Sequence, residues 1–356
     1  MMAPLVTRRR FLTWAAASPW ACALAGSTSR RIRIGQIGTS HSHAAGKIEA
    51  IRSLPQLYEL AGIVESSATQ RALIRSQQAY VGVNWTTEEA LLADPSVRAM
   101  TVETSLEDSS RAALACLRAG KHVHLDKPGT ASHEAFRTLR LEAERRGLTV
   151  QMGYMLRYNP AIQLLMQAHR EGWLGDITEI DASLGKLADA SAQNPLVQHP
   201  GHGMFELACH MVDLIVSLLG TPSRVQAFGL TTGLSLSSLK DNQVAVLEYP
   251  KAVVVLRCNH GDPFGWPHRR IQVVGTRGAM EIRPLESGQG TLYLSEARGG
   301  FVSGENRLAL TVPTGRYTGE FRDLAQVIQD GKTFAWSAQH DITAHATALR
   351  CAGLQP

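Results

Sequence analysis

The stretch that decides the fold reads Gly35-Gln36-Ile37-Gly38-Thr39-Ser40-His41-Ser42-His43 and lies between an apolar run and a stretch of helical pattern. A strand that leads through glycines into a helix is typical of a dinucleotide-binding loop, because bare backbone and a helix N-terminus can approach a pyrophosphate. Gly35 and Gly38 occupy the first two glycine positions of the pattern G-x-x-G-x-G-x-x-G, whereas Ser40 and His43 occupy the last two. The alternative is an ordinary tight turn between a strand and a helix.

An acid at the end of the next apolar run supports the nucleotide interpretation. Glu65 follows an expected strand, where an acid suits the hydroxyls of an adenine ribose and repels a 2′-phosphate. We therefore expect NAD rather than NADP, with a plain surface acid at a strand end as the alternative. The residues expected to bind the cofactor are Gly35, Gly38, Thr39, Ser40, His41, Glu65, Thr104, Asp126 and Lys127.

Two His-x-His pairs raise the question of a metal: His41 with His43, and His122 with His124. Metal sites usually need a third ligand and supporting partners. We therefore expect no metal at either pair. His41 and His43 are expected instead to bind phosphate or to shape the phosphate pocket.

The pattern of apolar runs divides the chain in two. Residues 30–153 alternate short apolar runs with helical stretches, which predicts a doubly wound parallel sheet of the Rossmann kind. Residues 154–356 carry consecutive strand-like runs with short turns, which predicts a large, open, mainly antiparallel sheet. One long helix is expected at 204–219. The fold class is thus α/β followed by α+β, with a nucleotide-binding domain and then a substrate and oligomerisation domain, whose last helices have room to pack back on the first domain.

The first 29 residues have the parts of an export signal. The motif Thr7-Arg8-Arg9-Arg10-Phe11-Leu12 resembles a twin-arginine signal, and the apolar run that follows is shorter than the ~20 residues that span a bilayer. A cleavage site follows at Ala23-Leu24-Ala25; an uncleaved anchor is the alternative. We expect the twin-arginine translocation machinery as a partner, a periplasmic or secreted location, and no membrane span in the mature form.

Charge and cysteine content argue against other classes of protein. The net charge of +5 falls to +2 without the three signal arginines, and no basic block follows, so no nucleic-acid partner is expected. Cys116, Cys209, Cys258 and Cys351 are too widely spaced for a zinc motif. We expect buried free thiols, with pairing in an oxidising compartment as the alternative.

Further motifs resemble one family. Leu125-Asp126-Lys127-Pro128 is similar to the Glu-Lys-Pro motif of the glucose–fructose oxidoreductase, inositol dehydrogenase and rhizopine-catabolism family (Gfo/Idh/MocA), with aspartate in place of glutamate. Other landmarks of that family follow in the same order at residues 153–160, 172–177 and 274–278. The resemblance covers about residues 31–353 and implies the same two-domain fold.

The resemblance also implies a catalytic set. The family pattern G-x-x-x-D-x-G-x-H-x-x-D falls on Glu206, His210 and Asp213, with Ala208 at its second glycine. Spacings of four and three place the three polar residues on one face of the expected helix. There Glu206 is expected to bring the pKa of His210 near neutrality; a buried, satisfied histidine is the alternative. By resemblance Lys127, Glu206 and His210 are catalytic, with Lys127 facing the developing alkoxide and His210 taking the hydroxyl proton.

The expected substrate is a small sugar or polyol, oxidised at a CH–OH group by tightly bound NAD that is recycled within one catalytic cycle. The candidate substrate contacts are Arg157, Tyr158, His202 and Asp213, with a core position as the alternative for Tyr158. Two other functions stay open: glycoside cleavage through a transient 3-keto sugar, and sugar binding without catalysis. An open sheet with an apolar face seldom stays bare, so a homodimer or homotetramer through residues 224–295 is expected.

Overall fold

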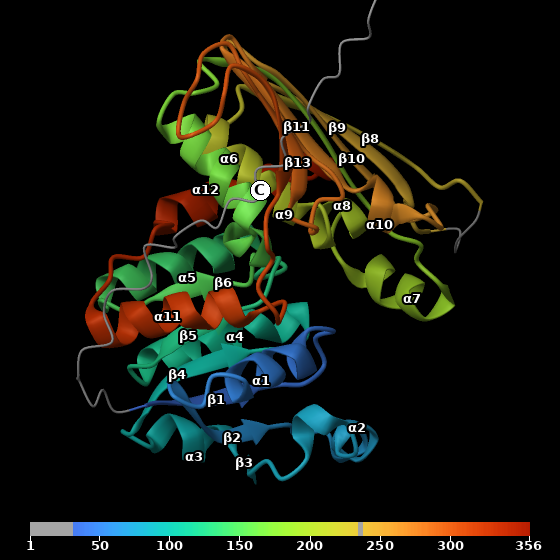
Figure 1. The fold of residues 1–356 in the computed structure, drawn as a ribbon. Coiled ribbons are helices and arrows are strands. Elements are labelled where there is room, and N and C mark those ends of the chain that lie inside the picture. The colour runs from blue at the N-terminus through green and yellow to red at the C-terminus, as the bar shows by residue number, and fades with distance from the viewer. Residues whose placement is uncertain (1–30, 234–237) are drawn as a thin grey trace, which may run out of the picture.

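The computed structural model describes residues 31–233 and 238–356. The motif at residues 7–12 and the cleavage site at 23–25 lie outside the described residues. Within the described part of the chain, no helix combines the length and the apolar character needed to cross a membrane. Two layered units, each built on one sheet, lie one above the other (Figure 1).

The first unit is a parallel sheet in the order β3-β2-β1-β4-β5-β6. Its strands are β1 (Ile32–Ile37), β2 (Tyr58–Val64), β3 (Trp85–Thr86), β4 (Val97–Val102), β5 (His122–Leu125) and β6 (Val150–Met152). Its helices are α1 (Ala44–Arg52), α2 (Ala68–Ile74), α3 (Glu88–Ala93), α4 (Leu106–Arg118) and α5 (His133–Arg145), with a 3₁₀ turn η2 (Gln78–Tyr80). The central strands β1 and β4 are buried along most of their length because helices cover both faces of a parallel sheet, and the predicted Rossmann sheet is confirmed.

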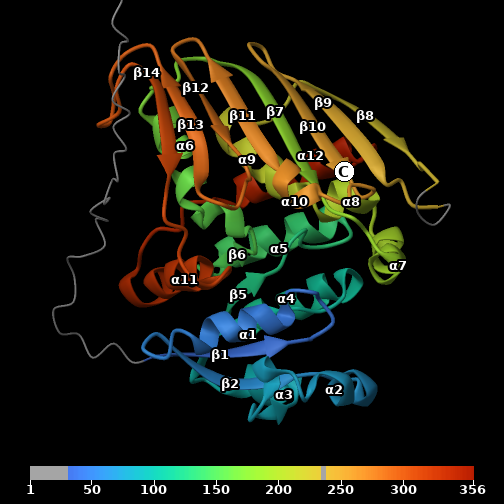
Figure 2. The same cartoon turned by 45° about the vertical axis from the view of Figure 1, so that its right-hand side comes forward.

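The second unit is an eight-stranded sheet in the order β14-β13-β12-β11-β7-β10-β9-β8. Its strands are β7 (Ile177–Gly185), β8 (Arg224–Leu230), β9 (Asn242–Glu248), β10 (Val253–Asn259), β11 (Arg270–Gly275), β12 (Gly278–Ile282), β13 (Gln289–Leu294) and β14 (Gly304–Ala309). All neighbours pair antiparallel except β7 and β10, so the predicted mainly antiparallel sheet is also confirmed. Helices cover one face, and the other face lies open (Figure 2).

The remaining helices belong to the second half of the chain. They are η3 (Met155–Tyr158), α6 (Pro160–Arg170), α7 (Ala190–Gln198), α8 (His202–Glu206), α9 (Cys209–Leu219), α10 (Gly265–His268), α11 (Thr318–Asp330) and α12 (Ala338–Cys351). Helix α11 leaves the second sheet and packs against α1 and β1 of the first unit (Figure 1). A buried ion pair holds it there, with 2.6 Å between Lys47 Nζ and Glu320 Oε2.

The helix predicted at 204–219 is wrong in one respect, because the structure divides it into α8 and α9. An unbroken helix would join the His210 N–H to the Glu206 carbonyl. Instead that N–H donates to Leu207 O at 3.4 Å, and Lys127 Nζ donates to Glu206 O at 2.8 Å. The break therefore gives a main-chain oxygen to a lysine of the first unit.

Two elements escaped the sequence prediction. Helix α7 lies in a polar stretch without a helical apolar pattern, and it contains Pro195, a residue that disfavours helix. Strand β14 is an edge strand whose polar residues show no apolar alternation. Each of the four cysteines considered above is buried as a free thiol.

Candidate active site

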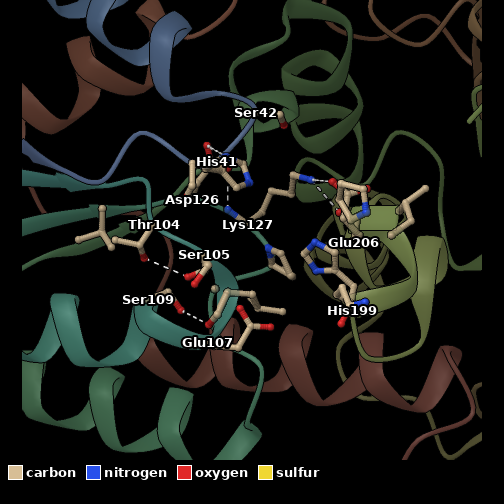
Figure 3. Close-up of a pocket in the computed structure, with 18 of the residues that line it drawn as sticks. His41, Ser42, Thr104, Ser105, Glu107, Ser109, Asp126, Lys127, His199 and Glu206 are labelled. Carbon is tan, nitrogen blue, oxygen red and sulfur yellow. Dashed lines mark hydrogen bonds and ion pairs between the residues drawn. The ribbon is translucent and has the colours of Figure 1, made fainter. Parts of the chain in front are cut away.

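A pocket of about 420 Å³ lies at the carboxyl ends of β1, β4 and β5, where α7 and α8 of the second unit face them (Figure 3). Ligands of open parallel sheets bind at this edge, since the loops there diverge. Its polar lining comes from both units and includes Ser40, His41, Ser42, Thr104, Ser105, Asp126, Lys127, Lys186, His199 and Glu206.

The loop after β1 makes a close turn over the end of β4. Gly38 has φ of +82°, and a Cβ there would lie 2.8 Å from Thr104 Cα and 2.9 Å from the Glu103 carbonyl carbon. Only glycine tolerates both the positive φ and this close approach to the backbone after β4. The Gly38 N–H donates to Val64 O at 2.9 Å, which fixes the loop against β2.

The other expected cofactor residues fall into two groups. Ser40, His41, Thr104, Asp126 and Lys127 line the pocket, whereas Gly35, Gly38, Thr39 and Glu65 do not. Thr39 Oγ1 donates to Glu65 Oε2 at 2.5 Å, which joins the loop to the end of β2. Glu65 therefore lies beside the loop after β1, as expected from its position after the second strand.

Lys127 and Glu206 meet across the boundary between the two units (Figure 3). Lys127 is 2% exposed, and its ammonium donates to a carboxylate oxygen of Glu206 as well as to the main-chain oxygen. Burial opposes charge on both groups, but their mutual attraction outweighs it: the pKa of Lys127 is raised, and that of Glu206 is held well below its usual value. The lysine is thus a fixed cation that can donate hydrogen bonds but cannot act as a base at neutral pH.

His210 differs from the expectation. Burial, followed by the nearby Lys127 charge, lowers its pKa well below the usual value. Its Nδ1 is buried without a hydrogen-bond partner, its ring packs edge-to-face on Tyr154, and it is not among the residues that line the pocket. The expectation that Glu206 tunes His210 toward neutrality is therefore wrong, because the helix break directs Glu206 to Lys127.

The expected substrate contacts lie elsewhere. Arg157 is buried and binds Asp213 in two hydrogen bonds of 2.9 and 2.6 Å and Asp341 in one of 2.7 Å. Tyr158 donates to Asp323 Oδ2 at 2.7 Å. Arg157 and Tyr158 thus contact helices that follow more than a hundred residues later, and Asp213 is a partner of Arg157.

His202 is also outside the pocket lining. Its Nδ1 accepts a hydrogen bond from the Lys240 N–H at 3.0 Å, and its φ of +55° is unusual for a residue other than glycine. The sequence missed Lys186 and His199, which do line the pocket. His199 lies in the polar stretch at 189–202, and Lys186 lies just before it. A polar stretch suits hydroxyl-rich ligands but does not single out a residue.

Two sequence models of one family match the chain. The model described as the oxidoreductase family, NAD-binding Rossmann fold, matches residues 32–154. The model described as the GFO/IDH/MocA C-terminal domain matches residues 162–281.

Individual relatives are distant. Trans-1,2-dihydrobenzene-1,2-diol dehydrogenase of Bos taurus is 27% identical over 199 residues, 54% of this chain and 57% of that protein. The chain thus spans little more than half the length of that relative. A scyllo-inositol 2-dehydrogenase (NADP(+)) of Bacillus subtilis is 23% identical over 271 residues, 71% of this chain and 75% of that protein.

A solved structure of levoglucosan dehydrogenase, in complex with NADH and levoglucosan, has a similar fold. The TM-score is 0.78 at 16% identity, over 91% of this chain and 98% of that one. At 16% identity, the similarity between the two chains shows a shared fold and nothing about the ligand.

Proposed function

Because the chain belongs to the Gfo/Idh/MocA family of oxidoreductases, we propose that it oxidises a CH–OH group of a sugar or polyol with a nicotinamide nucleotide as hydride acceptor. The observation that carries the proposal is the meeting of Lys127 and Glu206 in a pocket at the carboxyl edge of the first sheet. Hydride can leave an alcohol carbon only if the hydroxyl proton leaves too. A fixed cation beside a carboxylate meets the electrostatic part of that need.

The residues beside the pocket fit a dinucleotide. Gly38 brings bare backbone over the end of β4, and Ser40, Ser42 and Thr104 offer hydroxyl groups on the same wall. Such a cofactor supplies the hydride acceptor when bound. We propose NAD rather than NADP, held tightly, because the carboxylate of Glu65 repels a 2′-phosphate; the Bacillus relative is named for NADP(+), so this choice needs a direct measurement.

The side chains have distinct roles in the proposal. Lys127 donates to the substrate oxygen and stabilises its developing negative charge. Glu206 holds Lys127, and its Oε2, which is buried without a hydrogen-bond partner, accepts a substrate hydroxyl. His210 is the proposed proton acceptor, because it stands at the histidine position of the family pattern and its buried Nδ1 has no hydrogen-bond partner.

The experiment measures nucleotide binding and turnover separately. Purified protein is titrated with NADH and NADPH by fluorescence, and then assayed with a panel of inositols and hexoses. We expect Lys127→Met to keep nucleotide binding and to lose at least about 100-fold in turnover. Lys251→Met is the control, because that lysine pairs with Asp176 on the surface. Wild-type protein that binds neither nucleotide would contradict the proposal.

Export and assembly are further parts of the proposal. The twin-arginine motif supports a periplasmic location, and replacement of Arg8 and Arg9 by lysine is expected to retain the protein in the cytoplasm on cell fractionation. The open face of the second sheet, which carries the exposed side chains of Phe228, Val253 and Tyr293, supports a homodimer or homotetramer.

A further inference from the structure

We propose that His41, His43 and Asp126, joined by Glu103, form a binding site for a divalent cation of the zinc class beside the pocket. The site goes beyond the hydride-transfer function and does not depend on it. On sequence alone the His41-Ser42-His43 pair has no third ligand. The fold supplies one from the end of β5 and another from the end of β4.

The separations of the donor atoms match a coordination shell. His41 Nδ1 lies 3.4 Å from Asp126 Oδ2 and 3.4 Å from Glu103 Oε2, and His43 Nδ1 lies 3.0 Å from Asp126 Oδ2. Four ligands at zinc bond lengths of about 2.0–2.1 Å are about 3.3–3.4 Å apart along the edges of their tetrahedron. The ligand atoms of the two histidines and Asp126 all lie within 4.8 Å of one another. Side-chain adjustments of these three residues therefore suffice to enclose an ion, which would replace the 3.3 Å hydrogen bond from the His43 N–H to His41 Nδ1, and Glu103 joins the shell from the side of His41.

Glu103 is the independent observation that points to a ligand. Its side chain is fully buried, and neither carboxylate oxygen has a hydrogen-bond partner. Among the described residues its only ion-pair neighbour is His41, at the 3.4 Å given above. A buried carboxylate without a partner is costly, and a bound cation removes that cost.

The surrounding charges leave room for a dication. Two buried carboxylates, Asp126 and Glu320, share the ammonium of Lys47, whereas the buried Glu103 forms no ion pair with an ammonium among the described residues. Lys47 Nζ is 2.6 Å from Glu320 but 3.5 Å from Asp126, so it belongs mainly to Glu320. The other oxygen of Asp126 accepts from the Lys127 N–H at 2.7 Å, a supporting contact that fixes the carboxylate orientation.

The position of the site indicates what the ion would do. It would tie the loop after β1 to the ends of β4 and β5. His41 and Asp126 also line the pocket, and about a sixth of the His41 side chain is exposed. An open coordination position there would take an oxygen ligand from the pocket, such as a hydroxyl or a carboxylate.

The test measures metal binding in the absence of nucleotide and substrate, so its outcome is separate from that of the proposed oxidoreductase activity. Protein is stripped with a chelator and titrated with Zn²⁺ by calorimetry and with Co²⁺ by visible absorption, which reports ligand geometry. We expect one ion per chain. His43→Gln and Glu103→Gln are each expected to weaken binding by at least about 10-fold.

His268→Gln is the matched control, because His268 forms an exposed histidine–carboxylate pair with Asp262 at 2.7 Å. Circular dichroism and melting temperature establish that each variant is folded. If Glu103→Gln binds Zn²⁺ as tightly as the wild type, Glu103 is a protonated core residue and the four-ligand site is wrong. Absence of stoichiometric binding, or binding that His43→Gln leaves intact, also overturns the proposal.

Discussion

Lys127 shows how one side chain acquires its properties from two distant parts of the chain. It follows β5, and both of its acceptors belong to Glu206 at the end of α8. Burial alone would lower the pKa of a lysine, and only the adjacent carboxylate reverses the direction. The motif around Lys127 identified the residue from sequence, whereas its partner is a product of the fold.

The proton acceptor can be identified by comparing two histidines. His210→Gln is expected to reduce kcat by about 10²–10⁴-fold, the usual contribution of a positioned base, while nucleotide affinity is kept. His199→Gln, on the pocket wall just after α7, is expected to change KM more than kcat. Steady-state kinetics of both variants decide the matter. The reverse pattern would move the proton-accepting role to His199.

A buried histidine makes stability depend on pH. Burial lowers the pKa of His345 to about 4, so it is neutral in the folded protein at pH values where the unfolded chain, with a pKa near 6.5, takes up a proton. Its contribution is complete above about pH 6.5 and is lost as the pH falls toward 4, by at most about 1.4 kcal/mol per pH unit. His345→Phe should flatten the pH profile of the unfolding free energy over that range.

The control for this prediction is His268→Gln, which removes an exposed histidine. An unchanged slope in His345→Phe would show that the pKa of the ring is the same in the folded and the unfolded protein. The slope, and not the absolute stability, is the readout, because the variant also loses the 3.0 Å contact with Thr130 O.

At the scale of elements, the break between α8 and α9 matters most for the site. A helix that continued through Leu207 and Ala208 would use the Glu206 carbonyl for its own hydrogen bond. The apolar pattern of residues 204–219 runs through the break without interruption, so periodicity predicts one helix. Lys127, which lies 79 residues earlier in the chain, also donates to the Glu206 carbonyl. The apolar periodicity of residues 204–219 carries no information about this distant donor.

Helix α6 depends on a local cap. The Asn159 side chain accepts from the Ala161 and Ile162 N–H groups at 2.9 and 3.3 Å, and Pro160 occupies the first turn. Asn159→Ala is expected to lower the unfolding free energy by about 1–2 kcal/mol in urea denaturation. Asn159→Asp keeps the acceptor and should lose much less. Equal losses in both variants would mean that the cap contributes little.

At the scale of the whole molecule, buried ion pairs join distant segments. Arg157, just after the first unit, binds Asp213 on α9 and Asp341 on α12. Arg157→Met removes the cation that joins two buried carboxylates, of which Asp341 keeps Arg140 and Asp213 keeps His340 as neighbours, and is expected to cost about 3 kcal/mol. The KM of the variant, measured under conditions where it is folded, should equal that of the wild type, because Arg157 does not line the pocket. Arg224→Met, at an exposed pair with Glu248, is the control.

The open sheet face leads to a prediction about assembly. Val246 and Val255 are direct cross-strand neighbours on β9 and β10, and the exposed Phe228 of β8 pairs with Val244, two residues before Val246. Val246→Glu places a charge there and is expected to convert the homo-oligomer to monomer, measured by size-exclusion chromatography with light scattering. Leu73→Glu, at an exposed leucine of α2, is the control. A wild-type protein that is monomeric at all concentrations would contradict the prediction.

The sequence by itself determined the order of most strands and helices, the two kinds of sheet, the glycine turn at Gly38 and the lysine of the pocket. These features depend on residues close together in the chain: apolar period, a turn that only glycine allows, and a short motif after a strand. Only the tertiary structure decided which polar groups meet. Folding places Glu206 beside Lys127 and Asp213 beside Arg157. It also places Asp126 and Glu103 beside the His41–His43 pair. Partners of buried charges come from any part of the chain that folding places within a few ångströms, and no local pattern records that choice.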